Sequence, residues 1–252
     1  MYQPNMPSWK GHVLPLHVNE GISEGFILIG HGHLSTGTKP HYESLATAFH
    51  SRGYTTARFE PPNLQRTDGR IEARSLSTDA EQLNAVFKAL VNEFGHGVII
   101  GYSTGAAVMH NCYANAHIGL LPVNLKEQGQ AKLAQLSHNA RNVLDPRTTD
   151  VERGSYEYEG KFYVYPRLFW NDWTNWCSSL PQKIMQHTTP ALYISSQSDQ
   201  HARPHDVEQN YVRHAGPRAK SMNIRMPHRF TPENADSIAT LVSRWIEEKV
   251  VL

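Results

Sequence analysis

The fold of this 252-residue chain is decided by one stretch, Val98-Ile99-Ile100-Gly101-Tyr102-Ser103-Thr104-Gly105. Its three β-branched apolar residues predict a fully buried strand, and its last five form a Gly-x-Ser-x-Gly pentapeptide. In that pattern the serine sits on a sharp turn from strand to helix, and the glycines let the two elements approach closely. The turn holds the hydroxyl clear of the backbone, so Ser103 is a candidate nucleophile. A glycine-rich turn without chemistry is the alternative, but the strand before it and the helix predicted from Thr104 favour a nucleophile.

Short apolar runs alternate with helical periodicity around this stretch, which predicts an α/β fold with a mostly parallel sheet. We expect strands at His12–Val18, Phe26–Ile29, Tyr54–Phe59, Val98–Ile100, Ala191–Ser195 and Ser221–Arg225. Helices are expected at Tyr42–His50, Thr78–Phe94 (capped by Ser77 or Thr78), Asp206–Arg213 and Pro232–Lys249.

The alternation breaks between about residues 115 and 183. The first part of that segment is rich in Gln and Asn, and the part from Tyr156 to Trp176 is unusually aromatic. Since a structureless loop of this length is uncommon inside a compact domain, we interpret 115–183 as an inserted cap. Residues 1–114 and 184–252 then form the core domain.

Composition excludes several classes of function. The formal net charge is +1 and the basic residues are scattered, so a nucleic-acid partner is not expected. No apolar run is long enough to span a bilayer, and Met1 to Lys10 lacks the apolar core of a signal peptide. The two cysteines, Cys112 and Cys177, make no Cys-x-x-Cys pair. We therefore expect a cytoplasmic protein.

A serine nucleophile needs a base, and the base needs an acid to orient it. When the serine lies in a Gly-x-Ser-x-Gly elbow, the chain order is serine, acid, histidine. Asp199 follows the strand Ala191–Ser195, and His228 follows the last strand, so both fall on the expected loops. The chain holds 15 histidines, and position argues against the others: His110 and His117 lie too close behind the nucleophile.

Other acids and bases have weaker cases. Asp206 lies where helix capping explains it, and Asp172 falls in the expected cap. His201 and His205 flank Pro204 in a loop, and His214 lies near a helix end.

The turn Gly30-His31-Gly32-His33 follows the first apolar strand and is expected to supply a second oxyanion donor. The N–H groups of His33 and Thr104 are the candidate oxyanion hole. Binding of a metal by His31 and His33 is the rival interpretation. The pair has no acidic partner nearby, so we expect no metal there.

With these residues in place, the chain resembles α/β-hydrolases, particularly small capped esterases such as the bacterial cinnamoyl (feruloyl) esterases. The likeness rests on His31-Gly32-His33, on Gly101 to Gly105, on the acid turn from Ser196 to Pro204 and on His228-Arg229-Phe230. It implies an α/β-hydrolase fold with an eight-stranded type of sheet and no cofactor.

The expected activity is hydrolysis of a small-molecule carboxylic ester through an acyl-enzyme, by a triad of Ser103, His228 and Asp199. A thioesterase or amidase would use the same residues. A ligand-binding protein on this fold is the non-catalytic alternative.

The expected contacts to substrate come from His31 and Tyr102 beside the two turns, and from Phe169, Trp170 and Trp173 in the aromatic segment. The same rings can instead form a small core inside the cap.

Overall fold

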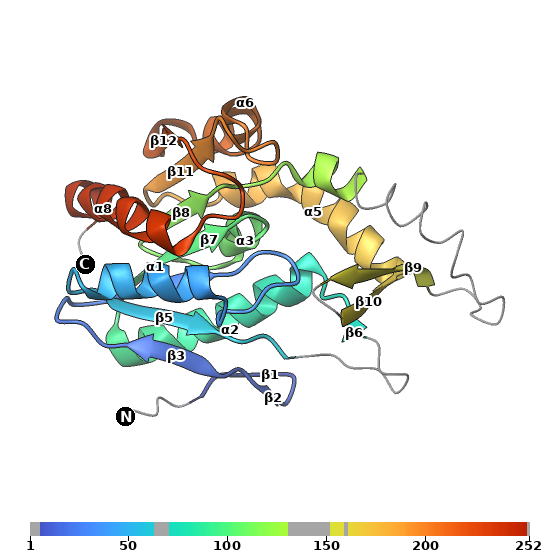
Figure 1. The fold of residues 1–252 in the computed structure, drawn as a ribbon, viewed down its shortest axis with the longest axis horizontal. Coiled ribbons are helices and arrows are strands. Elements are labelled where there is room, and N and C mark those ends of the chain that lie inside the picture. The colour runs from blue at the N-terminus through green and yellow to red at the C-terminus, as the bar shows by residue number, and fades with distance from the viewer. Residues whose placement is uncertain (1–5, 63–70, 131–151, 159–160, 251–252) are drawn as a thin grey trace.

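The computed structural model describes residues 6–62, 71–130, 152–158 and 161–250, and a seven-stranded sheet lies at its centre (Figure 1). The strand order is β12-β11-β8-β7-β4-β5-β3, and all neighbours are parallel except the edge strand β3, which runs antiparallel to β5. The strands are β3 (Leu16–Asn19), β4 (Phe26–Gly30), β5 (Thr55–Phe59), β7 (Gly97–Tyr102), β8 (Ala116–Leu120), β11 (Ala191–Ser196) and β12 (Ala219–Ile224).

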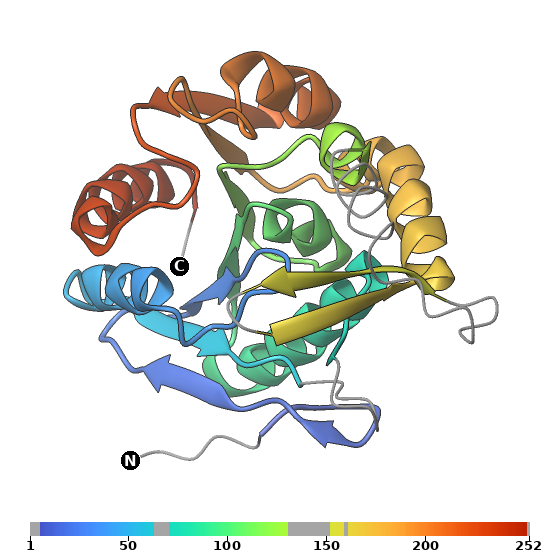
Figure 2. The same ribbon diagram turned by 45° about the vertical axis from the view of Figure 1, so that its right-hand side comes forward.

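Every residue of the five inner strands is buried. Helices cover both faces of the sheet, which is why the inner strands read as unbroken apolar runs in the sequence. Helices α1 (Pro40–His50) and α8 (Pro232–Lys249) pack against each other on one side, whereas α2 (Leu76–Phe94), α3 (Gly105–Val108) and α5 (Arg167–Met185) lie on the other (Figure 2).

The shorter helical elements all follow strands of the sheet. A 3₁₀ turn, η1 (Met109–Asn111), continues from α3 after β7. After β11 the chain forms α6 (Pro204–Val207), a π-helical turn η2 (Glu208–Val212), α7 (Arg213–Ala215) and a 3₁₀ turn η3 (Gly216–Arg218). The expected helix Asp206–Arg213 is confirmed: α6, η2 and α7 are contiguous, with a π-helical turn in the middle.

The expected first strand, His12–Val18, is wrong as one element. It is divided into β2 (His12–Val13) and β3, because Pro15 between them has no N–H and Leu14 donates its own N–H to Pro7 O. Strand β2 pairs with β1 (Ser8–Trp9) in a separate two-stranded sheet. The main sheet therefore has seven strands among the described residues rather than the expected eight.

The expected cap boundaries, 115 and 183, are also wrong. Strand β8 falls inside that segment, yet it is paired with β7 and β11 in the middle of the main sheet. At the other end, α5 continues past residue 183 to Met185. The segment between β8 and α5 comprises residues 121–166, of which 131–151, 159 and 160 lie outside the described residues.

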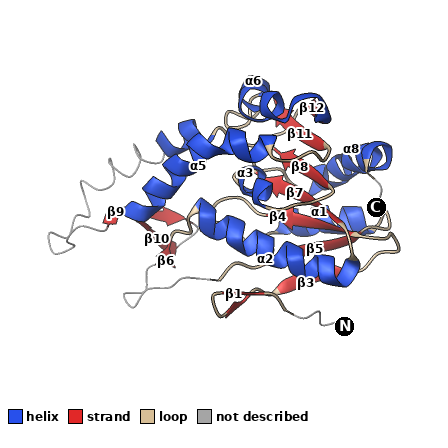
Figure 3. Cartoon of the chain, turned by 180° about the vertical axis from the view of Figure 1, so that it is seen from behind, coloured by secondary structure: helices blue, strands red, loops and turns tan. Residues whose placement is uncertain are grey.

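A third sheet combines two strands of that segment with one strand that precedes α2. Strands β9 (Glu152–Tyr158) and β10 (Lys161–Pro166) form an antiparallel pair, and β10 also pairs in parallel with β6 (Ile71–Glu72). This sheet lies beside one end of α2 and α5, away from the main sheet (Figure 3). Residues 125–130, directly after β8, are helical.

Helix α2 begins two residues earlier than expected. Its N-cap is Ser75, whose hydroxyl accepts from the N–H of Thr78 at 3.1 Å. Ser77, one of the two expected caps, instead donates its N–H to the Asp172 carboxylate at 3.0 Å. Asp172 is therefore committed to the start of α2. Within the described ranges, no helix is both long and apolar enough to cross a membrane.

Candidate active site

Ser103 occupies a strained turn between β7 and α3. Its φ angle is +56°, a left-handed conformation that costs a residue other than glycine about 1–3 kcal/mol. A Cβ on Gly101 would lie 2.3 Å from Gly105 O, and a Cβ on Gly105 would lie 2.6 Å from His31 O. Both glycines of the pentapeptide are thus required sterically, as the sequence predicted. The Ser103 N–H donates to Leu120 O at 3.0 Å, which fixes the turn to β8.

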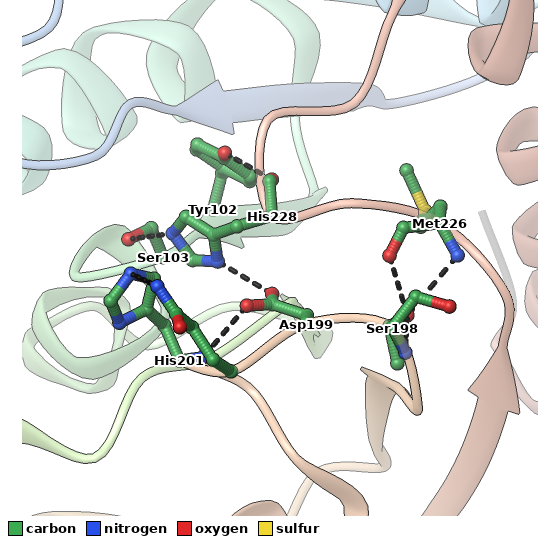
Figure 4. Close-up of polar contacts among 9 residues, drawn as sticks. Tyr102, Ser103, Ser198, Asp199, His201, Met226 and His228 are labelled. Atoms are coloured by element: carbon green, nitrogen blue, oxygen red, sulfur yellow. Dashed lines mark hydrogen bonds and ion pairs between the residues drawn. The ribbon is translucent and has the colours of Figure 1, made fainter.

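The three residues predicted from chain order lie together in one hydrogen-bonded row (Figure 4). His228 Nε2 is 3.0 Å from Ser103 Oγ, and His228 Nδ1 is 2.6 Å from Asp199 Oδ2. These are the distances that proton transfer from serine to histidine needs. The arrangement leaves the Nδ1–H of the imidazole pointing at the carboxylate, so Nε2 faces the serine as an acceptor.

The electrostatics of the row favour an ionised acid. Burial by itself raises the pKa of Asp199, whose side chain is inaccessible to solvent. The hydrogen bond and charge of His228, together with the N–H of His201 at 2.8 Å, outweigh that effect and hold the Asp199 pKa below its ordinary value. Asp199 thus stays a carboxylate, and a carboxylate stabilises a protonated His228.

A residue that the sequence did not single out, Ser196, joins the acid loop to the base loop. Its hydroxyl donates to Met226 O at 2.6 Å and accepts from the N–H groups of Met226, at 3.1 Å, and Ser198, at 3.2 Å. These hydrogen bonds tie the loop that carries Asp199 to the loop that carries His228.

Tyr102 holds the loop that carries His228 in place. Its hydroxyl donates to the backbone carbonyl of His228 at 2.5 Å, and its ring lies 5.5 Å from the His228 ring and 5.4 Å from that of Phe230. Tyr102 also lines the cavity at Ser103. The residue expected to contact substrate therefore also holds the histidine in place.

Ser103 opens into a cavity of about 190 Å³. Its walls come mainly from the turn after β4, the start of α1, the turn at Ser103 and the loop that carries His228. The lining residues are Gly32, His33, Ser35, Lys39, His41, Tyr42, Tyr102, Ser103, Gln128, His228 and Arg229.

The expected oxyanion donors flank this cavity. Thr104 directly precedes the first residue of α3, where N–H groups have no intrahelical acceptor. The turn that carries His33 approaches the nucleophile closely, because a Cβ on Gly32 would lie 3.2 Å from Ser103 Cβ. Gly32 itself donates to the Tyr42 hydroxyl at 3.0 Å, which anchors the turn.

Four residues expected to bind substrate lie outside the lining of this cavity. His31 is buried against Phe59, with Nδ1 3.1 Å from Gly32 O, and burial together with the charge of Arg74 lowers its pKa to about 4. The buried rings of Phe169 and Trp173 pack behind His33, at 5.5 and 5.8 Å. Trp170 and Trp173 line a different cavity, beside residues 126–130.

The competing acids and bases are occupied elsewhere. Asp206 pairs with Arg203 at 2.5 Å, which fits a helix-start role. The His201 ring lies edge-on to His228 at 5.2 Å, and its backbone N–H donates to Asp199 Oδ1 at 2.8 Å.

Comparison with known proteins identifies the fold. No protein-family model matches the chain, and no curated protein matches it in sequence. Among solved structures, it is similar to ferulic acid-bound Est1E from Butyrivibrio proteoclasticus (TM-score 0.70, 15% identity, covering 97% of this chain and 98% of that one). It is also similar to the esterase Pf2001 of Pyrococcus furiosus (0.66, 14%, 100% and 94%) and to the thioesterase domain of the curacin biosynthetic pathway (0.60, 14%, 96% and 99%). The chain has the α/β-hydrolase fold, as the sequence predicted.

The Tyr102 hydroxyl gives a first test of this site. In Tyr102→Phe, the loop carrying His228 loses one neutral hydrogen bond, typically 0.5–1.5 kcal/mol. We expect kcat for an activated ester to fall by roughly 3- to 10-fold, with the melting temperature nearly unchanged. Steady-state kinetics and thermal unfolding of the same preparation check this. An unchanged kcat would mean that the hydroxyl does not position the histidine.

Proposed function

We propose that this protein is a serine hydrolase that cleaves small-molecule carboxylic esters through an acyl-enzyme. The observation that supports it most is the row Ser103–His228–Asp199, in which the serine is presented on a strained elbow at the bottom of a cavity. Esterases of known structure share the fold of this chain, which is in accord with the proposal. At 14–15% identity, this likeness concerns the fold and not the activity.

The mechanism follows from the directions of the hydrogen bonds. His228 Nε2 takes the proton as Ser103 Oγ attacks the ester carbonyl carbon, and Asp199 stabilises the imidazolium that forms. The imidazolium then donates this proton to the leaving alcohol, and the acyl group remains on Ser103. In the second half, His228 takes a proton from water as the water oxygen attacks the acyl carbon. The imidazolium then returns the proton to Ser103 Oγ, the bond from serine to the acyl group breaks, and the acid leaves.

The N–H groups of Thr104 and His33 are the proposed oxyanion hole. Each would donate to the oxygen that becomes negatively charged in the two tetrahedral intermediates, an effect worth about 3 kcal/mol for each donor. Since both donors are backbone groups on turns fixed by glycine contacts, they need no reorganisation during the reaction. No step of this mechanism calls for a cofactor.

Two related functions compete with this one. A thioesterase or amidase would use the same three residues. One structural neighbour is the curacin thioesterase domain, so a thioester is the first alternative substrate to test. A non-catalytic binding protein has no need of a nucleophile in line with a base and a buried acid, so the hydrogen-bonded row favours catalysis.

The proposal predicts which histidine is essential. His228→Ala should lower kcat for ester hydrolysis by about 10³-fold or more, and Asp199→Asn should also cause a severe loss. His201→Ala is the matched control, because that ring adjoins His228 while the N–H that contacts Asp199 is kept. It should change kcat by only a few-fold. Near-normal turnover in His228→Ala, with a collapse in His201→Ala, would move the base to His201.

We further propose that residues 121–166 form a cap and that the aromatic residues at the start of α5 shape the substrate pocket through His33. Phe169 and Trp173 contact the His33 ring, and Trp173 Nε1–H donates to Leu125 O at 2.7 Å. These rings thus join α5 to the chain leaving β8, just behind the cavity wall. Direct contact between these rings and substrate stays a prediction.

Trp173→Ala tests this role of the aromatic cluster. Removing the ring behind His33 should raise KM for esters with a bulky aromatic acyl group more than KM for acetates. Trp176→Ala is the matched control, because Trp176 is equally buried but bonds to Ser77 Oγ at 2.9 Å, at the start of α2. Equal loss of stability in both variants, with unchanged selectivity, would show that the rings form only a core of the cap.

A further inference from the structure

Three histidines from separate parts of the chain meet in one buried cluster that the hydrolase mechanism does not use. His110 belongs to η1, His117 to β8, and His187 follows α5. All three are buried, and one ring nitrogen from each lies within 4.8 Å of those of the other two. Their ring centroids are 5.1, 5.6 and 4.3 Å apart.

The cluster lies at the opposite end of the sheet from Ser103. His117 is the second residue of β8, level with Ile99 of β7 and with Ala191 at the start of β11. Ser103 follows the carboxyl end of β7. A ligand bound at the histidines would therefore be remote from the esterase site and would act on the fold.

The hydrogen bonds of two of the imidazoles give these rings the orientation that is common for histidine ligands of a metal ion. His117 Nε2 lies 2.9 Å from Cys112 O, and His187 Nε2 lies 2.9 Å from His110 O. A carbonyl only accepts, so each Nε2 carries the proton, and each neutral ring keeps a lone pair on Nδ1. A ligand histidine commonly has this pattern, with one nitrogen donating to a carbonyl and the other holding the lone pair that binds the metal. In this structure the His117 Nδ1 lone pair accepts from the Thr189 hydroxyl at 3.3 Å, and a metal ion would take the place of that hydrogen.

The third imidazole leaves a nitrogen unsatisfied. His110 Nε2 lies 3.1 Å from the Tyr193 hydroxyl, whereas its Nδ1 is buried and has no hydrogen-bond partner among the described residues. A buried polar atom without a partner is destabilising. Coordination to a metal ion would remove that deficit.

The donor set suits a metal that bonds to neutral nitrogen. All three donors are imidazoles, and no carboxylate or thiolate belongs to the cluster among the described residues. The Arg218 guanidinium, which donates to Thr189 O at 3.0 Å, adds positive charge nearby. An ion held mainly by charge, such as Ca²⁺ or Mg²⁺, is thus disfavoured, whereas Zn²⁺ and similar ions prefer imidazole.

We propose that His110, His117 and His187 form a structural site for a divalent transition-metal ion of the Zn²⁺ type, which ties η1, β8 and the end of α5 together. Three nitrogens at Zn–N distances near 2.0–2.1 Å would lie roughly 3.4 Å apart in a tetrahedral site. Because the three nitrogens lie within 4.8 Å of one another, they would move together by at most about 1.4 Å to reach that spacing, and a water molecule would be the fourth ligand.

The test is metal binding by the full chain, independent of hydrolysis. After treatment with a chelator and its removal, the protein is titrated with ZnCl₂ by calorimetry and with CoCl₂ by visible absorption. We expect one equivalent to bind, with the absorption of tetrahedral Co²⁺ displaced by Zn²⁺. At free Zn²⁺ of 100 Kd the melting temperature should rise by about 5–10 °C.

Variants separate this site from other histidines of the chain. His187→Gln, at the outer side of the cluster beneath the exposed Tyr113 ring, should lower metal affinity by about 100-fold or more. His110→Gln should do the same, and His50→Gln, at the exposed end of α1, should leave affinity unchanged.

Two results would overturn the proposal. One is a folded wild-type protein that binds no stoichiometric Zn²⁺. The other is one-equivalent binding that survives both cluster substitutions. Either would show that the histidines form only a hydrogen-bonded part of the core. Because the readout is metal binding, its failure says nothing against the proposed esterase, and an inactive esterase says nothing against the metal site.

Discussion

The left-handed backbone at Ser103 is the constraint on which the rest of the site depends. No side chain at Gly101 or Gly105 would let β7 and α3 approach as closely as they do. The strain at the serine is offset by burial of the inner strands around it and by the hydrogen bond from Ser103 N–H to Leu120 O. The elbow therefore exists only when the sheet has formed, and the position of the nucleophile is set by the core.

The acid and the base reach the serine from two loops at the same end of the sheet, and both loops are fixed by groups outside the proposed triad. Ser196 joins them through Met226, while Tyr102 holds the carbonyl of His228. Each bond is individually worth about 1 kcal/mol. Together they restrict the imidazole to the geometry in which one nitrogen faces the carboxylate and the other faces the hydroxyl, and such preorganisation makes a short hydrogen-bonded row useful for catalysis.

The sequence predicted the features that arise from local chemistry and chain order. The elbow was recognisable because only glycine fits its flanks, and the positions of Asp199 and His228 followed from the order of strands in the α/β-hydrolase fold. Helix α8 was predicted to the residue because proline suits the first turn of a helix and Pro232 stands there. Because the fold class and the meeting of Ser103, Asp199 and His228 also follow from local chemistry and chain order, both agree with the prediction.

Features that depend on contacts between distant segments were not predictable from the sequence. The N-cap of α2 was misplaced because Ser77 bonds to Asp172, 95 residues away. Strand β8 was assigned to the cap because its five residues lie beside a polar segment, and only its pairing with β7 and β11 shows it to be core. The histidine cluster spans residues 110 to 187, and no spacing rule brings such residues together.

The central claim, that Ser103 is an activated nucleophile, is tested most directly by covalent labelling with a fluorophosphonate, followed by mapping of the labelled peptide by mass spectrometry. The account predicts one label per chain, located on Ser103, and none in a folded Ser103→Ala variant. Labelling that persists in that variant, or a folded wild-type protein that takes up no label, would contradict it.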